Sequence, residues 1–140
     1  MSCKVRNKMK FSGGCLCGAL RYESNKEAIE TGYCHCSICR KSTSAPLVAF
    51  ASFPVDSFSY SQGSPSVYQS SPTGTREFCS KCGTQICHRA IDAPETVDVN
   101  SGTLDDITLV PPQCHIYISE SVPWLEIDDQ LPRYTKGPVE

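Results

Sequence analysis

The sequence predicts a mainly β protein made of short antiparallel strands. Several short stretches either alternate apolar and polar residues or are apolar throughout, and clusters of glycine, proline and serine separate them. No stretch of the chain sustains the apolar spacing that an amphipathic helix needs. The one helical segment that we expect is a single short turn at residues 37–44.

The composition is that of one ordinary globular domain. The chain has 140 residues, of which 39% are hydrophobic and 20% are charged, so it can bury a core of its own. We expect a flexible leader at residues 1–12, a single zinc domain at 13–134 and a tail at 135–140. The formal net charge of −2 offers no basic surface to nucleic acid, and no apolar run approaches the ~18 residues of a membrane span. Neither nucleic acid nor a membrane is therefore an expected partner.

Cysteine usage indicates a reducing compartment. Ten cysteines are many for this length, but the first residues, MSCKVRNKMK, are polar and basic, unlike a secretory signal. Thiols in an intracellular protein are used for metals more often than for disulfides. We therefore expect a cytoplasmic protein whose cysteines bind metal, with Cys3 and Cys114 as free thiols.

The first half of the chain alternates strands and turns. Residues 19–23 alternate apolar and polar side chains, which is typical of a strand, and 24–31 form a charged connection. Residues 45–51 are apolar nearly throughout, which favours a buried strand. A turn at 54–58 feeds the next strand, and a short strand follows at 67–69.

The second half continues in the same way. Residues 75–78 form a strand that runs into a C-x-x-C-G turn, and 85–89 form the return strand of that hairpin. Further strands are expected at 97–100 and 114–118. Residues 123–134 contain two prolines and are expected to wrap irregularly over the sheet.

Four cysteines form two pairs that suit one structural zinc ion. Cys15 and Cys17 lie in the segment GGCLCG, and Cys79 and Cys82 lie in the segment CSKCG. A structural zinc usually takes four ligands from two turns that are distant in the sequence. The neighbouring glycines allow the tight backbone bends that direct two sulfurs to one point.

Three further cysteines, Cys34, Cys36 and Cys39, have the spacing C-x-C-x-x-C. The first two are too close along the chain for an unstrained disulfide, whereas three thiolates from a tight turn can occupy three corners of a zinc tetrahedron. If the protein supplies the fourth corner, this is a second structural zinc. If the corner is open, a substrate can bind there. Spacing leaves both possibilities, and the candidates for a fourth ligand are Cys87, His88, His35 and Cys114.

Four blocks of the sequence carry a family resemblance. The segments GGCLCGALRYE, YCHCSICRKS, FCSKCGTQI and HIYISESVPWLEIDDQLPRY, in this order, resemble the glutathione-dependent formaldehyde-activating enzyme family, whose fold is similar to that of Mss4. Paired cysteine turns occur in many zinc proteins, but the last block makes the resemblance specific. It covers roughly residues 13–134 and implies a mainly β, Mss4-like fold stapled by zinc.

The resemblance also implies a function. It implies a structural zinc on the first four cysteines and a catalytic zinc on Cys34, Cys36 and Cys39, with room for a substrate thiol. The implied activity is that of a carbon–sulfur lyase, the reversible formation of S-hydroxymethylglutathione from glutathione and formaldehyde. This chain departs from the family at 42–44, where Ser-Thr-Ser replaces a usual Ser-Gly pair, so the shape of its substrate pocket is expected to differ.

The ligand set agrees with this chemistry. Three thiolates on Zn²⁺ leave a net charge of −1, which makes a weaker Lewis acid than a three-histidine site. A thiol at the fourth corner would still lose its proton and could attack a small carbonyl carbon. The alternative is a non-catalytic, zinc-stabilised binding module of the same fold, which a fourth protein ligand would indicate. The sequence specifies neither the thiol nor the aldehyde.

Other residues have weaker assignments. Arg40 and Lys41 follow the third cysteine and either contact a carboxylate of the thiol or are solvated charges. His88 and His115 alternate within expected strands and are read as sheet residues rather than ligands. Trp124 is expected to pack on the sheet.

Overall fold

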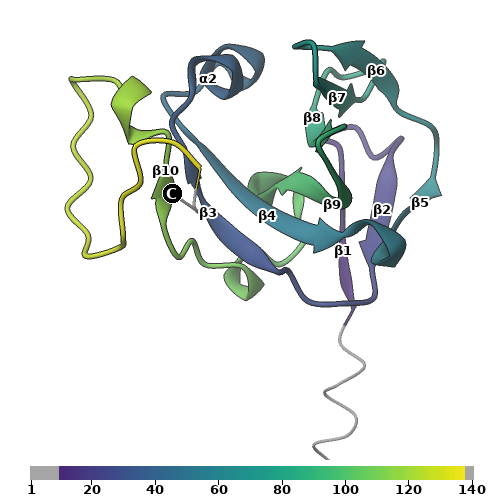
Figure 1. The fold of residues 1–140 in the computed structure, drawn as a ribbon. Coiled ribbons are helices and arrows are strands. Elements are labelled where there is room, and N and C mark those ends of the chain that lie inside the picture. Colours follow the sequence, from purple (N-terminus) through teal and green to yellow (C-terminus); the bar gives the residue numbers. More distant parts are fainter. Residues whose placement is uncertain (1–9, 138–140) are drawn as a thin grey trace, which may run out of the picture.

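A computed structural model describes residues 10–137 of the chain, which form two β-sheets (Figure 1). The smaller sheet has the antiparallel order β1-β2-β5. Its strands are β1 (Phe11–Gly14), β2 (Arg21–Ser24) and β5 (Phe58–Gln62). Most of the expected leader, including Cys3, and the end of the expected tail lie outside the described residues.

The larger sheet has seven strands in the order β10-β3-β4-β9-β8-β7-β6. Their bounds are β3 (Glu30–Cys34), β4 (Val48–Pro54), β6 (Ser66–Gln69), β7 (Gly74–Phe78), β8 (Gln85–Ala90), β9 (Ala93–Asn100) and β10 (His115–Ile116). Neighbouring strands are antiparallel except for β10 and β3, which run parallel. The predicted mainly β class is confirmed, with this one parallel pair as the exception.

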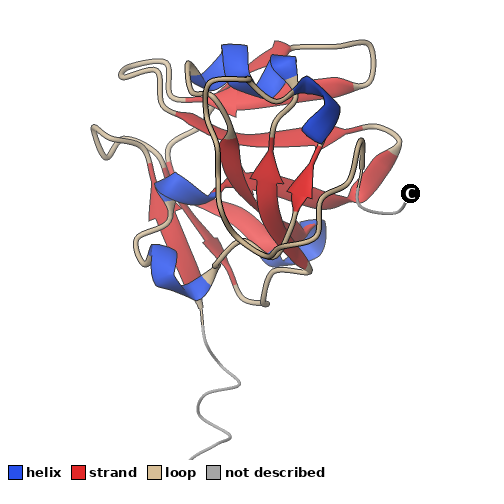
Figure 2. Cartoon of the chain, turned by 90° about the vertical axis from the view of Figure 1, so that its left-hand side faces the viewer, coloured by secondary structure: helices blue, strands red, loops and turns tan. Residues whose placement is uncertain are grey.

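Helical structure is short and lies around the strands rather than in a layer of its own (Figure 2). The α-helix of the described residues is α2 (Ser37–Thr43), where the sequence predicts its single turn. The 3₁₀ turns are η1 (Val55–Ser57), η2 (Ser101–Thr103), η3 (Ile107–Leu109) and η4 (Ile118–Glu120). Within residues 10–137 no helix is long and apolar enough to cross a membrane.

The hydrophobic core lies between the two sheets. Because side chains alternate along a strand, β4 and β9 direct one set of residues inward, and Phe53 and Val99 are fully buried there. Phe11 and Tyr22 approach from the small sheet, and the ring centroids of Phe11 and Phe53 are 5.3 Å apart. Each such buried side chain contributes about 1.5–3 kcal/mol, so this face fixes the register of the large sheet.

The opposite face of the large sheet carries a row of polar residues. Adjacent strands pair them directly, so that each member of the row lies beside the next. The row runs across five strands as Arg76, His88, Asp98, Ser52 and Glu30. A polar row on the face turned away from the core indicates that this face serves something other than packing.

The positions of two strands, β1 and β3, differ from those expected from the sequence. β1 begins at Phe11, whose ring is buried in the core, two residues before the expected start of the domain at 13. β3 extends into the expected connection at 24–31 because it pairs with β4 on one side and β10 on the other. Gly32 permits this fit, since a Cβ there would lie 2.9 Å from the carbonyl oxygen of Cys114. Both strands depend on partners that are distant in the sequence.

The segment after β10 also differs in part. It is irregular, as expected, and backbone hydrogen bonds join it to β10, with His115 N donating to the carbonyl of Pro132 at 2.9 Å. Trp124, however, is 74% exposed, so the expectation that it packs on the sheet is wrong. Pro123 and Trp124 lie in a turn of this segment, and the indole is on its solvent side.

Candidate metal centres

Two clusters of cysteine sulfurs occur in the described residues, and each lies where strands end in tight turns. The first brings Cys15 and Cys17, between β1 and β2, to Cys79 and Cys82, between β7 and β8. The sulfurs of Cys15 and Cys17 are 3.7 Å apart, and those of Cys17 and Cys79 are 3.8 Å apart. With Zn–S bonds of about 2.3 Å, the edge of a tetrahedron is about 3.8 Å, so this donor set fits zinc.

Glycines and backbone amides shape the turns of this four-cysteine cluster. Gly18 and Gly83 have φ of 84° and 82°, a conformation that other residues rarely adopt. The amide of Leu20 donates to the sulfur of Cys15 at 3.2 Å. The hydroxyl of Thr84 lies 3.2 Å from the sulfur of Cys82 and, with neighbouring amides, lowers the pKa of that thiol to about 5. Such donors favour the thiolate form that a metal requires.

The second cluster lies at the junction of β3 and α2. Cys34 ends β3, Cys36 is the N-cap of α2, and Cys39 lies in the first turn of that helix. Their sulfurs are all within 4.8 Å of one another. The sulfur of Cys36 accepts the amide hydrogen of Cys39 at 3.3 Å, as a helix cap does. Hydrogen bonds with the Cys34 and Cys39 thiols lower the pKa of Cys36, which favours its thiolate form.

No fourth side chain from residues 10–137 completes this three-cysteine cluster. Cys87 faces the core instead, where its thiol donates to Glu77 Oε1 at 3.2 Å. Cys114 donates to the carbonyl of Thr31 at 3.7 Å. His88 pairs with Asp98, with 3.5 Å between Nδ1 and Oδ2. Each of these candidate fourth ligands therefore has a partner of its own away from the cluster.

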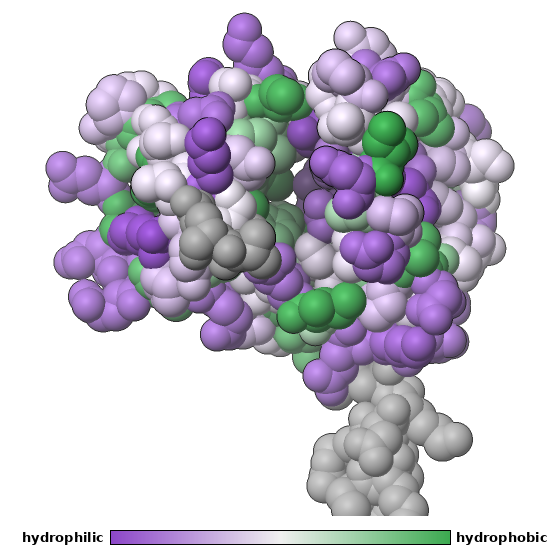
Figure 3. Space-filling model, in the orientation of Figure 1, coloured by the Kyte–Doolittle hydropathy of each residue, from purple (hydrophilic) through white to green (hydrophobic). Residues whose placement is uncertain are grey.

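The three-cysteine cluster opens on a cleft, whereas the four-cysteine cluster does not line it. The cleft has a volume of about 450 Å³ and is hollowed into the face seen in Figure 3. Val48, Phe50 and Ile116 give it apolar walls. All five members of the polar row of the large sheet line it as well. A small molecule in this space would contact the sulfurs, the apolar walls and the polar row together.

Arg76, in β7, brings a positive charge to the cleft. Its Nη2 lies 3.6 Å from the sulfur of Cys39, and its Nε donates to the hydroxyl of Ser70 at 3.1 Å. The side chain is buried among the cleft residues. Arg76 could not be recognised from the sequence, because it is far from Cys39 along the chain and meets it only through the pairing of the strands.

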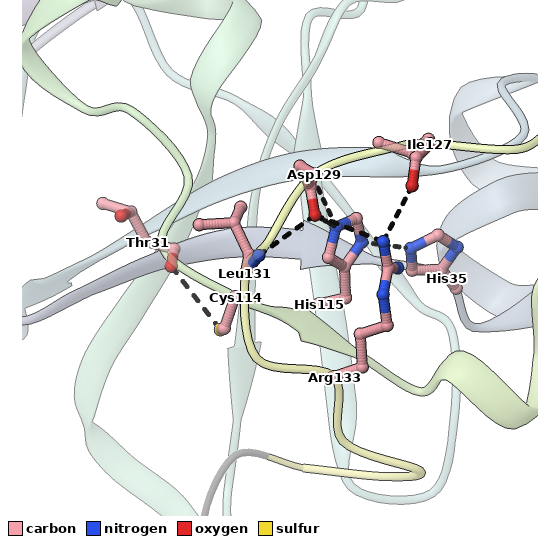
Figure 4. A network of polar contacts seen from close by, with 8 residues as sticks. All are labelled: Thr31, His35, Cys114, His115, Ile127, Asp129, Leu131 and Arg133. Carbon is pink, nitrogen blue, oxygen red and sulfur yellow. Dashed lines mark hydrogen bonds and ion pairs between the residues drawn. The ribbon is translucent and has the colours of Figure 1, made fainter.

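The last candidate for a fourth ligand, His35, belongs to a polar network in which the two histidine rings are buried (Figure 4). Its Nε2 is 2.9 Å from Nδ1 of His115, whose Nε2 is 2.9 Å from Oδ2 of Asp129. Arg133 donates to the same carboxylate and to the carbonyl of Ile127. Burial lowers the pKa of His35, and the hydrogen bond to His115 lowers the pKa of Asp129. The network fixes the chain after β10 to the turn that holds Cys34 and Cys36.

The segment that contains η4 covers the start of α2. Glu120 accepts the amide hydrogen of Ser37 at 2.8 Å, and Tyr117, with φ of 58°, lines the cleft. Left-handed backbone is uncommon outside glycine and asparagine and is found at sites that the surrounding structure holds in place. Sequence reasoning missed both residues, since they reach the site through the fold of the C-terminal segment.

Arg40 and Lys41 do not line this cleft. They lie in the last turn of α2 beside a separate hollow that Trp124 also borders. Nε of Arg40 is buried without a hydrogen-bond partner in the described part of the chain. If Arg40 and Lys41 bind a ligand rather than water, they therefore do so on a surface separate from the cleft of the three-cysteine cluster.

Comparisons with known proteins identify the family of this chain. The family model described as glutathione-dependent formaldehyde-activating enzyme matches residues 10–120. A Halomonas elongata protein named as a putative glutathione-dependent formaldehyde-activating enzyme is 28% identical over 87% of this chain and 83% of its own. A Schizosaccharomyces pombe protein named as an uncharacterized lyase is 34% identical over 55% of this chain, and the match spans only 56% of that protein's length. Among solved structures, a Rhodobacter sphaeroides protein is similar with a TM-score of 0.57 and 27% identity, covering 67% of this chain and 87% of that one.

Proposed function

Because the chain belongs to the glutathione-dependent formaldehyde-activating enzyme family, we propose that it is a zinc-dependent carbon–sulfur lyase that joins a small thiol to an aldehyde and cleaves the adduct. Glutathione and formaldehyde are the first substrates to test, since the family and the Halomonas relative are named for them. The bond that forms joins the sulfur to the carbonyl carbon, while the proton of the thiol ends on the carbonyl oxygen. The product is a hemithioacetal, which with formaldehyde carries an S-hydroxymethyl group, and no oxidant or reductant is needed.

The contrast between the two cysteine clusters carries the proposal. One has four sulfurs, which complete a tetrahedron, and the other has three sulfurs that border a cleft. Closed four-ligand zinc sites are structural, whereas catalytic sites keep one position for a substrate or water. The arrangement supports a structural metal at the first cluster and a substrate-binding metal at the second.

The residues of the cleft have separate roles in this proposal. A zinc ion held by Cys34, Cys36 and Cys39 would bind the substrate sulfur and favour its ionised form. Val48 and Phe50 exclude water from one side, which preserves the nucleophilicity of sulfur and prevents solvent from competing for the aldehyde. The volume of about 450 Å³ admits a small thiol with its tail along the polar row of the large sheet.

The test compares the exchange rate of thiol and aldehyde with and without the enzyme. The adduct also forms without a catalyst, so exchange NMR on ¹³C-formaldehyde and glutathione measures how much the zinc-loaded protein accelerates interconversion. We expect acceleration by the native chain and by Cys114→Ser, which changes a thiol outside both clusters, but none above background by Cys36→Ser. Equal acceleration by Cys36→Ser would exclude the three-cysteine cluster as the catalytic centre. Absence of acceleration by the native chain would favour the binding-module alternative.

A further inference from the structure

We propose that Arg76 is a positioning residue that offsets the negative charge of the three-cysteine cluster, so that a substrate thiolate can join the same metal. This inference rests on the proposed function, because it concerns the fourth position at that cluster. It assigns a role to a residue of β7 that contributes no sulfur and lies far in sequence from the cysteines. Arg76 acts through Cys39, to whose sulfur its Nη2 donates at 3.6 Å.

Arg76 lies where its positive charge can act strongly on the sulfur of Cys39. The residue is 8% exposed and lines the cleft, so its guanidinium is poorly screened by water. Ser70 Oγ accepts from Nε at 3.1 Å and holds the planar group in a fixed orientation toward Cys39. Pairing with His88 on β8 places no carboxylate beside it in the next strand.

Among the described residues, Arg76 and Arg40 lack the carboxylate partner that the other three arginines have. Those three form ion pairs with carboxylates: Arg21 with Asp105, Arg89 with Glu77, and Arg133 with Asp129. In the part of the chain that the structure describes, Arg76 forms no such pair. A buried cation is costly unless an anion compensates it. Among the described residues, the group within hydrogen-bond distance of its guanidinium that can carry a negative charge is the sulfur of Cys39.

The charge at the metal explains why compensation matters. Zn²⁺ with three cysteine thiolates carries a net charge of −1, and a fourth thiolate would raise this to −2 within a partly apolar cleft. The guanidinium returns the total to −1. A hydrogen bond to a ligand sulfur also withdraws charge from that sulfur, which leaves the metal more able to hold a further anionic ligand. Without Arg76, the cluster should retain its metal but bind a fourth thiolate more weakly.

Thiol affinity of the cobalt-loaded full-length protein tests this inference directly. Co²⁺ in tetrahedral thiolate sites has sulfur-to-metal charge-transfer absorption, so titration reports binding at the metal independently of turnover. The probes are 2-mercaptoethanol, whose tail is neutral, and 3-mercaptopropionate, whose tail is a carboxylate. We expect Arg76→Gln to bind both thiols roughly tenfold to a hundredfold more weakly, as expected for loss of a charge-assisted contact.

Two further variants separate charge from shape. Arg76→Lys keeps the charge and should recover most of the affinity, even if the planar hydrogen bonds are lost. Arg21→Gln makes the same substitution in an ion pair outside the cleft and should leave the affinity unchanged. If Arg76→Gln does not fold, Arg76→Met, which is also uncharged and similar in length, takes its place in the same comparison.

Each other outcome overturns the inference. Equal affinity in Arg76→Gln and the native chain would show that the charge is irrelevant. A loss confined to 3-mercaptopropionate would make Arg76 a contact for the substrate tail instead. If the native cobalt protein shows no thiol-dependent absorption, the proposed function fails as well, whereas normal native binding with an unaffected Arg76→Gln leaves that function intact.

Discussion

Nε2 of His35 lies 2.9 Å from Nδ1 of His115, and both rings are buried. This contact joins the turn between Cys34 and Cys36 to the C-terminal segment, because Asp129 holds the other side of the His115 ring. The amide of His35 also donates to the carbonyl of Ile116 at 3.0 Å. The chain after β10 therefore forms part of the support for the three-cysteine cluster.

Removal of the His115 ring should lower the stability of the fold and loosen the support of the three-cysteine cluster. His115→Ala deletes a side chain with no exposed surface and leaves its partners unsatisfied, so we expect a loss of about 3 kcal/mol in the free energy of unfolding. Urea denaturation measures this loss. His88→Ala, which removes a partly exposed ring 3.5 Å from the carboxylate of Asp98, should cost much less and is the matched control. Similar losses for both variants would contradict a special role for the network.

The four-cysteine cluster should contribute mainly to stability. Cys17→Ser should reduce the zinc content from two ions per chain to one and lower the melting temperature more than Cys36→Ser does. The reason is that the first cluster ties the small sheet to the β7–β8 hairpin, while the second lies within one local turn. Metal analysis and thermal unfolding of the two variants test this. A larger loss of stability in Cys36→Ser would reverse the two assigned roles.

Cys87 should be inert and dispensable for metal binding. Burial and the adjacent carboxylate of Glu77 raise the pKa of the Cys87 thiol, and the side chain faces the core. We expect Cys87→Ser to keep both metals, and we expect native Cys87 to resist iodoacetamide until the protein unfolds. Mass spectrometry of alkylated peptides and metal analysis provide the measurements. Loss of one metal in Cys87→Ser would show that the second site closes around this residue.

The buried hydroxyl of Tyr22 should make the free energy of unfolding fall at alkaline pH. Burial raises the pKa of its hydroxyl, which lies 2.7 Å from the hydroxyl of Thr103. Above pH ~10 the unfolded chain releases this proton while the folded chain retains it, so stability should fall by about 1.4 kcal/mol per pH unit from this group. Below pH ~10 the contribution is fully present. Tyr22→Phe should show a shallower decline in urea denaturation between pH 10 and 11, and an unchanged slope would contradict this assignment.

The cysteine clusters could be predicted from sequence because ligand spacing within a turn is local. Cys15 with Cys17 and Cys79 with Cys82 each occupy one tight turn, and the structure brings the two turns together as expected. The short helix at α2 followed from the same local reasoning. Whether these sulfurs bind metal remains a prediction.

The cleft could not be predicted in the same way. Arg76 meets Cys39, and His115 meets His35, only after strands distant in the sequence have paired. β3 was missed because Gly32 weakens its strand pattern, and its pairing with β4 and β10 overrides that weakness. Trp124 was misplaced because an aromatic residue in an irregular segment gives no indication of which way it points.

A crystal structure of the zinc-loaded protein with glutathione would test the central claim most directly. We predict a zinc ion bound by Cys34, Cys36 and Cys39, with the glutathione sulfur about 2.3 Å from the metal and the rest of the molecule in the cleft. A protein side chain at the fourth position, with glutathione absent from the cleft, would contradict the account.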